Sequence, residues 1–454
     1  MSGLFGTISI SLRALLAQQA AIETSSQNIA NITTPGYTRR RVIMQEDASW
    51  TSSALEPGKG VQVAGIESLR DRVLELRIQS ELQKQARDDS FVQSMRPIEL
   101  LLGTASTGLG ADINKFFNSL QKLSAAPTDP THRAAVLMAA QDLAASFRST
   151  ASGISAVNQH VETELSQSLQ EINRLTAQIA ALNTQVAARQ QIGADAAALE
   201  DQRGLLMRQL SELVDFSTVD DPSGLTLTTS NGAPLVVAGR SVDLTTVTGP
   251  DGRSQIFSLD RNVTESITGG KLGGLLAVRD QQLRTLSSEI DTLAYSLAER
   301  INQVHRGGFD FAGSAGLDLF TTSATSGGAA RCMQVAFTDP ALLAASSDGT
   351  PGSNGNLLSL VSVATAPLLS GRSPIDAYAQ IVFSVGSVIA NTGSNAQASQ
   401  LVVQQLENQR NAVSGVSLDE EAAHLIRFER AYQAAARVIS VTNDLLDSVI
   451  NLGR

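Results

Sequence analysis

Cysteine, tryptophan and histidine are scarce in this sequence, which has one cysteine, one tryptophan and four histidines in 454 residues. A single cysteine excludes an internal disulfide framework, and we expect Cys332 to lie in the core. No histidine has metal-site spacing such as H-E-x-x-H, so we expect each to be a surface or capping residue rather than a ligand. The histidines are His132, His160, His305 and His424.

Long apolar runs and excess positive charge are also missing. No window approaches 18 consecutive apolar residues, so we expect no membrane insertion. The net charge of −10 argues against binding a polyanion, and nucleic acid is not an expected partner. The only basic cluster is Arg39-Arg40-Arg41. We interpret it as a solvated strand edge, with contact to an acidic neighbouring subunit as the functional alternative.

No arrangement of residues in the sequence indicates catalysis. There is no G-x-S-x-G elbow and no carboxylate cluster flanked by motif glycines. Lys271 lies in the glycine-rich run 269–274, but no Ser or Thr follows it, so we predict a flexible entry into helix instead of a phosphate loop. We therefore expect no enzyme, no catalytic residues, no cofactor and no metal. The first twenty residues also lack a secretory signal, since Arg13 interrupts the apolar part and no basic residue precedes it.

The first thirty residues carry a coiled-coil pattern. Eight positions repeat at spacings of three and four, and six of them are apolar. Only Arg13 and Glu23 are charged in this stretch, and the small uncharged residues around them indicate close packing on several sides, inside an assembly. The apolar positions are Phe5, Ile8, Leu12, Leu15, Ile22 and Ile29.

A hinge is predicted where this helix ends. Asn31 is expected to take the left-handed conformation that closes a helix. Pro35 disfavours helix at Thr34, and Pro35-Gly36 fit the central positions of a type II turn. The hinge motif comprises Asn28, Asn31, Thr34, Pro35, Gly36 and Tyr37.

The last forty residues repeat the same spacing, with eight of ten positions apolar. Either stripe alone would indicate an ordinary amphipathic helix on a globular core. Because the two match, we predict that the terminal helices pair as a coiled coil. The apolar positions are Leu418, Leu425, Phe428, Tyr432, Ala435, Ile439, Leu446 and Val449.

The middle of the chain is expected to be mainly helical, with one small β insertion. Helices are predicted from Thr131 to Ser149, from Ser155 to Gln191 as a rod of roughly 50 Å, from Asp195 to Val214 and from Leu275 to His305. Strand-like alternation with turn signals replaces the helical period over 216–268, and 42–63 is expected to be loop or short strand. So small a β insertion should lean on a neighbour. The predicted fold class is mainly α with a small inserted β domain, paired terminal helices and a long helical column.

Three domains follow from this division of the chain. The first is a terminal coiled coil of 1–40 with 415–454. The second is a helical wall of 41–215 with 270–305 and 355–414. The third is a small outer β-rich domain of 216–269 with 306–354.

The two ends of the chain resemble the axial proteins of the bacterial flagellum, the family of rod, hook and hook-associated proteins. The N-terminal resemblance lies in Ala30-Asn31-Ile32-Thr33-Thr34-Pro35-Gly36-Tyr37. The C-terminal resemblance lies in Ser414-Gly415-Val416-Ser417-Leu418-Asp419-Glu420-Glu421 and in Ala431-Tyr432-Gln433-Ala434. The resemblance implies termini that coil together in the inner tube of a helical polymer, while the middle of the chain faces outward.

Two internal segments resemble the family of the first hook-associated protein more specifically. One is Leu199-Glu200-Asp201-Gln202-Arg203, which departs from the family pattern at Gly204, where an acidic residue is usual. The other runs from Asn302 to Phe320 and distinguishes this family from hook and rod subunits. Its motif residues are Asn302, His305, Gly308, Asp310, Gly313, Gly316 and Phe320.

The resemblance implies a structural protein that joins hook to filament by self-assembly at the hook tip. It implies export through the flagellum without a cleaved signal, and hence an extracellular location. The implied partners are further copies of the chain, hook subunits, the adjoining second junction protein and a flagellar export chaperone. The alternatives are a hook or distal-rod subunit and, from a different class, a secreted coiled-coil effector or adhesin.

Overall fold

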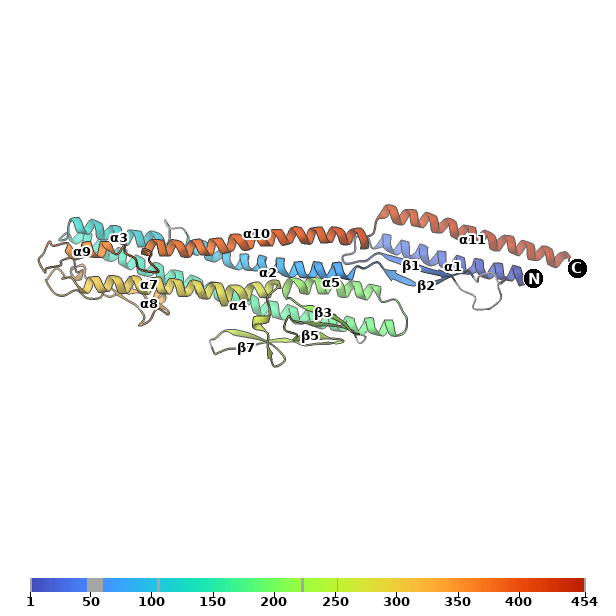
Figure 1. The fold of residues 1–454 in the computed structure, drawn as a ribbon, viewed down its shortest axis with the longest axis horizontal. Helices are drawn as coiled ribbons and strands as arrows, with labels where there is room; N and C mark the ends of the chain where they lie inside the picture. Colours follow the sequence, from blue (N-terminus) through green and yellow to red (C-terminus); the bar gives the residue numbers. More distant parts are fainter. Residues whose placement is uncertain (1, 47–59, 104–106, 222–223, 251, 453–454) are drawn as a thin grey trace.

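The computed structural model describes residues 2–46, 60–103, 107–221, 224–250 and 252–452. Its helices run lengthwise in a long, narrow molecule, and both termini lie at the same end (Figure 1). The fold class is the predicted one, mainly α with a small β insertion. In the described part of the chain, no helix is both long and apolar enough to cross a membrane.

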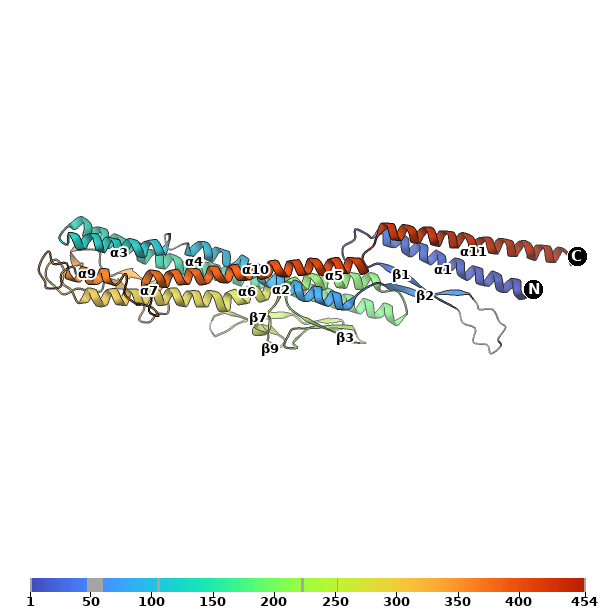
Figure 2. The same cartoon turned by 45° about the horizontal axis from the view of Figure 1, so that its top comes forward.

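The terminal unit pairs the two ends of the chain. Helices α1 (Ser2–Ala30) and α11 (Leu418–Leu452) lie side by side in both ribbon views (Figures 1 and 2). Strands β1 (Arg40–Glu46) and β2 (Val61–Ser68) form an antiparallel hairpin that contacts α1. Residues 42–63 were expected to form loop or short strand. The structure has a strand at each end of this stretch, and residues 47–59 lie outside the described part of the chain.

A column of long helices continues from the terminal unit and holds one connected apolar core. Helix α10 runs along α2, and α6 packs against α2 where Gly274 leaves no room for a side chain, since a Cβ there would lie 2.3 Å from the carbonyl oxygen of Arg87. This close approach explains the glycine-rich run around Lys271, whose ammonium pairs with Glu164. The column helices are α2 (Arg72–Leu102), α3 (Leu109–Ala125), α4 (Pro130–Gln191), α5 (Ala197–Leu213), α6 (Gly270–Ala277), α7 (Leu283–Arg306) and α10 (Pro374–Ser414).

The prediction of two separate helices over 131–149 and 155–191 is wrong. The structure has one helix here, α4, of 62 residues. Asp129 caps its start by accepting hydrogen bonds from the amides of Thr131 and His132. The weak helix formers around Gly153 do not break it. Gly153 lies where Leu101 packs against the helix, and the buried stripe continues from Phe147 to Ile154. Tertiary packing therefore overrides the local propensity.

The β insertion lies on one side of the column and packs against α4 (Figure 1). Two asparagines of α4 hold it. The amide nitrogen of Asn183 donates to the carbonyls of Leu225 and Ala238, and that of Asn173 donates to Leu244. Its two antiparallel sheets have the orders β3-β4-β5-β6 and β7-β8-β9. The strands are β3 (Ser217–Asp221), β4 (Gly224–Thr228), β5 (Pro234–Val237), β6 (Arg240–Ser241), β7 (Leu244–Thr248), β8 (Ser254–Ser258) and β9 (Arg261–Asn262).

The segment 306–354 lies at the end of the column away from the termini, apart from the β insertion (Figure 1). We expected residues 306–354 and 216–269 to form one outer domain. In the structure the two segments lie at different places along the column (Figure 1). Anchors at the end of α7 hold the segment beside α3, α4 and α7 instead. Cys332 is exposed here, which corrects its expected place in the core. The elements of this end are β10 (Phe320–Thr321), α8 (Ala329–Cys332), β11 (Gln334–Val335), η3 (Pro340–Leu342) and α9 (Gly355–Ser362).

Candidate functional site at the hinge

The hinge motif forms a tight turn after α1. The amide of Tyr37 donates to the carbonyl of Thr34, and Gly36 has a φ of 79°, as a type II turn with Pro35-Gly36 at its centre requires. Asn31 does not take the expected left-handed conformation. Its side chain closes the helix instead, since its Nδ2 donates to the carbonyl of Gln27 and its Oδ1 accepts from Thr34 Oγ1.

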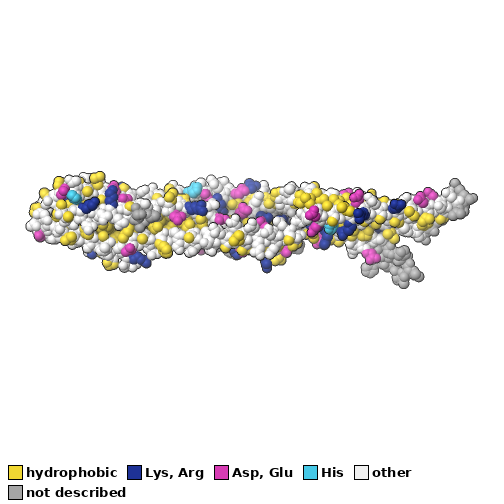
Figure 3. Space-filling view, turned by 90° about the horizontal axis from the view of Figure 1, so that it is seen from above, with side chains coloured by type: hydrophobic (Ala, Val, Ile, Leu, Met, Phe, Trp, Pro, Cys, Tyr) yellow, Lys and Arg dark blue, Asp and Glu magenta, His cyan; other side chains and the backbone are white. Residues whose placement is uncertain are grey.

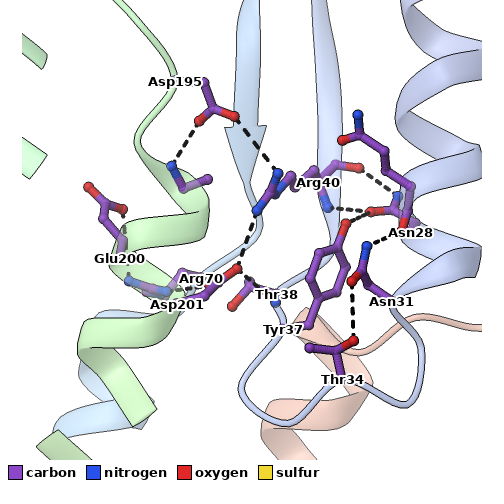
Figure 4. Close-up of polar contacts among 12 residues, drawn as sticks. Asn28, Asn31, Thr34, Tyr37, Thr38, Arg40, Arg70, Asp195, Glu200 and Asp201 are labelled. Atoms are coloured by element: carbon purple, nitrogen blue, oxygen red, sulfur yellow. Dashed lines mark hydrogen bonds and ion pairs between the residues drawn. The ribbon is translucent and has the colours of Figure 1, made fainter. Parts of the chain in front are cut away.

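Asn28 ties the end of α1 to the strand that follows the turn (Figure 4). Its buried side chain pairs with the backbone of Arg40, donating to the carbonyl at 2.9 Å and accepting from the amide at 3.0 Å. Asn28 Oδ1 also accepts the Tyr37 hydroxyl at 2.8 Å, and burial raises the pKa of that hydroxyl. These bonds fix the direction in which the chain leaves the helix.

Asp201 on α5 is the acidic centre of the hinge (Figure 4). Its nearly buried carboxylate lies 2.6 Å from Arg70 Nη2 and 3.6 Å from Arg40 Nη2, and it accepts the amide of Thr38 at 3.4 Å. Arg40 also reaches Asp195 at 3.8 Å. One carboxylate therefore joins the turn, the hairpin and the helical column.

Arg39 joins the hinge to the start of α11. Its guanidinium lies 2.7 Å from a carboxylate oxygen of Glu421 and 2.7 Å from one of Glu420, and its amide donates to the carbonyl of Ser414. This corrects the interpretation of the basic triplet as a solvated edge, because Arg39 and Arg40 are largely buried and pair within the chain. Only Arg41 is mostly exposed, and it pairs with Glu67.

Sequence reasoning missed the roles of Asp201 and Glu421. The signal was present, since both acids lie in segments singled out by family resemblance and the only basic triplet of the chain follows the hinge motif.

On α11, the predicted seam positions occupy the face that the rest of the chain covers. The two polar positions of the ten, Glu421 and Thr442, are buried, and Leu425, Phe428, Tyr432, Ile439 and Leu446 are half-buried. Leu418 and Val449, at the two ends of the stripe, are about half exposed.

On α1, the predicted stripe is only partly covered. Ile8, Leu15, Ile22 and Ile29 are half-buried, whereas Phe5 is 60% and Leu12 49% exposed in the single chain. The most buried positions of α1 are small or polar, because short side chains allow close packing of backbones. They are Ser11, Ala17, Ala21, Thr24, Ser25 and Asn28.

The second motif, from Asn302 to Phe320, lies at the opposite end of the column and has a structural role. Asn302 Nδ2 donates to the carbonyl of Phe320, while its Oδ1 accepts the amides of Leu319 and Phe320. Phe320 is buried edge-to-face against Phe116. The motif therefore anchors the returning chain to the end of α7.

His305 corrects the expectation of a surface histidine, because its ring is fully buried. Its Nδ1 lies 2.5 Å from the carbonyl of Leu317, and its Nε2 accepts the amide of Ala344 at 2.9 Å. This arrangement requires a neutral ring with the proton on Nδ1, and burial lowers the pKa of His305.

The glycines and the aspartate of this motif permit and stabilise a compact loop. A Cβ on Gly316 would lie 2.0 Å from the carbonyl oxygen of His305, and one on Gly308 would lie 2.2 Å from Asn356 Nδ2. Gly313 has a φ of 78°, and Asp310 Oδ1 accepts the amides of Ala312 and Ser314. Across the described residues, no group of three or more His, Cys, Asp or Glu side chains is arranged to hold a metal ion.

Family models match three parts of this chain. The Flagellar hook-associated protein FlgK helical domain matches residues 95–320, the Flagella basal body rod protein family matches residues 8–38, and the Flagellar basal body rod FlgEFG protein C-terminal family matches residues 407–452. Flagellar hook-associated protein 1 of Bacillus subtilis is 28% identical over an alignment 500 positions long, which covers 99% of this chain and 99% of that protein. The chain belongs to the FlgK family.

Two further FlgK proteins support the same assignment. Flagellar hook-associated protein 1 of Escherichia coli is 26% identical, covering 98% of this chain and 99% of the relative. The solved structure of the flagellar hook junction protein FlgK from Burkholderia pseudomallei superposes with a TM-score of 0.68 at 17% identity, covering 74% of this chain and 100% of that one. The fold is therefore that of FlgK, and the match to the FlgK helical domain ends at Phe320, the last residue of the motif that distinguished this family from hook and rod subunits.

Proposed function

We propose that this FlgK-family chain is a structural subunit of the junction between hook and filament, and that it self-assembles helically at the hook tip. The observation that carries the proposal is the side-by-side pairing of α1 and α11 at one end of a long column, with apolar side chains left exposed on both helices. Such a terminal unit is suited to packing against neighbouring subunits.

The exposed apolar side chains form a definite pattern. On α11, Val438, Val441 and Leu445 are spaced by three and four residues and are each about half exposed, and on α1 Phe5 and Leu12 are seven residues apart. Around the joint between α10 and α11, Figure 3 shows further apolar side chains at the surface. Covering them in an assembly would contribute about 1 kcal/mol for each half-exposed side chain, which favours addition of subunits.

The hinge gives the terminal unit a fixed orientation on the column. Because Asp201 and Glu421 bind arginines from the same short segment, the inner helices and the outer wall are held as one piece. In this proposal 1–40 with 415–454 form the inner tube, 41–215 with 270–305 and 355–414 form the wall, and the β insertion faces outward.

The proposed partners are further copies of the chain, hook subunits, the adjoining second junction protein and a flagellar export chaperone. The role is structural and requires no catalysis. We further propose export without a cleaved signal and an extracellular place in the flagellum.

Electron microscopy of cells lacking the protein, paired with an assay for filament protein in the medium, tests this function. Hooks without filaments, together with released filament protein and recovery on re-expression of the gene, are the expected result. Absence of hooks would instead indicate a hook or rod subunit. Normal flagella would contradict the proposal.

A further inference from the structure

We propose that a basic groove along the column, beside the β insertion, binds an extended acidic segment of a partner protein. The groove consists of a hollow of about 1040 Å³ between the β insertion and the column and an adjoining one of about 380 Å³ that is lined mainly by α4, α7 and residues 326–331. Arg253, Arg279 and Arg284 line both hollows, so the two form one continuous surface.

The charge of this groove is opposite to that of the chain, whose net charge is −10. Five arginines line it, and two of its three acids are already engaged. The Asp280 carboxylate accepts two 2.8 Å hydrogen bonds from Arg279, and Asp291 accepts the amides of Gly328 and Ala330. The arginines are Arg87, Arg253, Arg279, Arg284 and Arg331, and the acids are Glu265, Asp280 and Asp291.

Two of these arginines are free to bind a ligand. Arg284 and Arg331 are exposed, and neither has an ion-pair partner among the described residues. Arg284 lies where the two hollows meet, and Arg331 lies at the end of the smaller one.

A π-helical segment gives the groove a fixed floor. Segment η2 (Val278–Gln282) joins α6 to α7, and its Arg279 side chain is 2% exposed. That guanidinium also bonds to Glu162 at 3.2 Å and to the carbonyl of Ser254 at 2.8 Å, which links α4, the β insertion and the π segment. Short π segments inside helices occur frequently at functional sites, because the extra residue changes which side chains face a surface.

The length and lining of the groove favour a polypeptide ligand. Its lining runs along α6 and α7 from Gly273 to Asp291, about 27 Å at 1.5 Å per residue, which an extended segment of about eight residues would span. Arginine forks bind carboxylates in a bidentate manner. No aromatic side chain is among the lining residues described, so the stacking that holds single-stranded nucleic acid has no platform here.

Fluorescence anisotropy with the full-length protein tests the proposal. The probes are a labelled peptide of eight glutamates and the same peptide with eight glutamines, at low and moderate salt. We expect the glutamate peptide to bind and the glutamine peptide not to bind. Binding of the glutamate peptide should be weaker at the higher salt concentration. Arg284→Gln with Arg331→Gln should weaken its binding at least tenfold. The matched control, Arg189→Gln with Arg300→Gln, removes the same charge from exposed positions outside the groove and should bind as the parent does.

Two results would overturn the proposal. One is no binding of the glutamate peptide to the parent protein, whether or not inorganic polyphosphate binds in its place, and the other is an equal loss of binding in the control variant. Thermal melting of both variants verifies folding, and hydrogen exchange should show protection over 276–288 when the peptide is bound. Binding is measured in solution without flagella, so failure here is distinguishable from failure of the junction role.

Discussion

Arg39 and Glu421 are separated by 382 residues in the chain, yet Arg39 Nε lies 2.7 Å from Glu421 Oε1. The pair joins the segment that follows α1 to the first turn of α11. The Glu421 side chain is 3% exposed, whereas the neighbouring Glu420, which also reaches Arg39, is 59% exposed. The buried Arg39–Glu421 ion pair therefore links the two ends of the chain at the point where the terminal helices meet the column.

Glu421→Gln should destabilise the terminal unit, because it removes the buried one of the two carboxylates that pair with the partly buried Arg39 guanidinium. We expect a loss of about 2 kcal/mol in the free energy of opening α11, measured by hydrogen exchange of its amides. Glu420→Gln is the matched control, and it should cost less than about 1 kcal/mol since that carboxylate is in water. Equal effects of the two substitutions would show that burial of the pair does not matter.

Asp201→Asn should loosen the contact between hinge and column. The amide keeps the shape of the side chain but removes the charge that meets Arg40 and Arg70, and we expect a loss of about 3 kcal/mol in urea unfolding. Asp195→Asn, whose carboxylate is 42% exposed and 3.8 Å from Arg40, should cost under about 1 kcal/mol. If both variants unfold like the parent, Asp201 does not hold the hinge.

His305 should make stability depend on pH. Its folded pKa lies below the ordinary value, so its contribution is fully present above about pH 6.5 and is lost as the pH falls toward the folded pKa, because the unfolded ring takes up a proton first. We expect a loss of at most about 1.4 kcal/mol per pH unit, measured as the free energy of unfolding between pH 7.5 and 5.5.

His305→Gln provides the control for that measurement. It should be less stable at every pH, since Gln cannot reproduce both ring bonds, but it should lose this part of the pH dependence. An unchanged slope would place the titrating group elsewhere.

Leu425→Asp or Ile439→Asp should abolish incorporation into the flagellum while the column stays folded. Each puts a charge on the covered face of α11, and the column core lies elsewhere. The measurement is electron microscopy and motility of cells lacking the native gene, with circular dichroism of the purified variants. Leu358→Asp, an exposed leucine on α9, should complement normally. Normal filaments with the α11 variants would exclude this face from assembly.

Two glycine substitutions should have opposite effects on thermal stability. Gly316→Ala should destabilise by about 3 kcal/mol, because its Cβ would overlap the carbonyl oxygen of His305. Gly204 lies inside α5, and a Cβ at this position would have no atom within 4 Å. Gly204→Ala should therefore stabilise the folded protein by about 0.5 to 1 kcal/mol. A melting temperature that falls for Gly204→Ala would reveal a need for flexibility beside Asp201.

The sequence predicted local structure well wherever periodicity or turn chemistry decides it. The type II turn at Pro35-Gly36 is as expected, because its hydrogen bond and its dihedral angles involve only residues 34–37. The break expected near Gly153 is absent, since burial of Phe147 and Ile154 outweighs weak propensity. Cys332 is exposed because the segment that carries it lies on the outside of the column.

The sequence by itself determined that this chain has two matching terminal helices, a hinge, a helical column and a β insertion, together with its family resemblance. Apolar spacing, prolines and glycines act over short distances and can be read from the order of residues. Only the tertiary structure decided that Arg39 meets Glu421, that Arg40 and Arg70 share Asp201, and that His305 is buried and neutral. These contacts join residues that are distant in the chain, and their energies depend on burial, which no local pattern specifies.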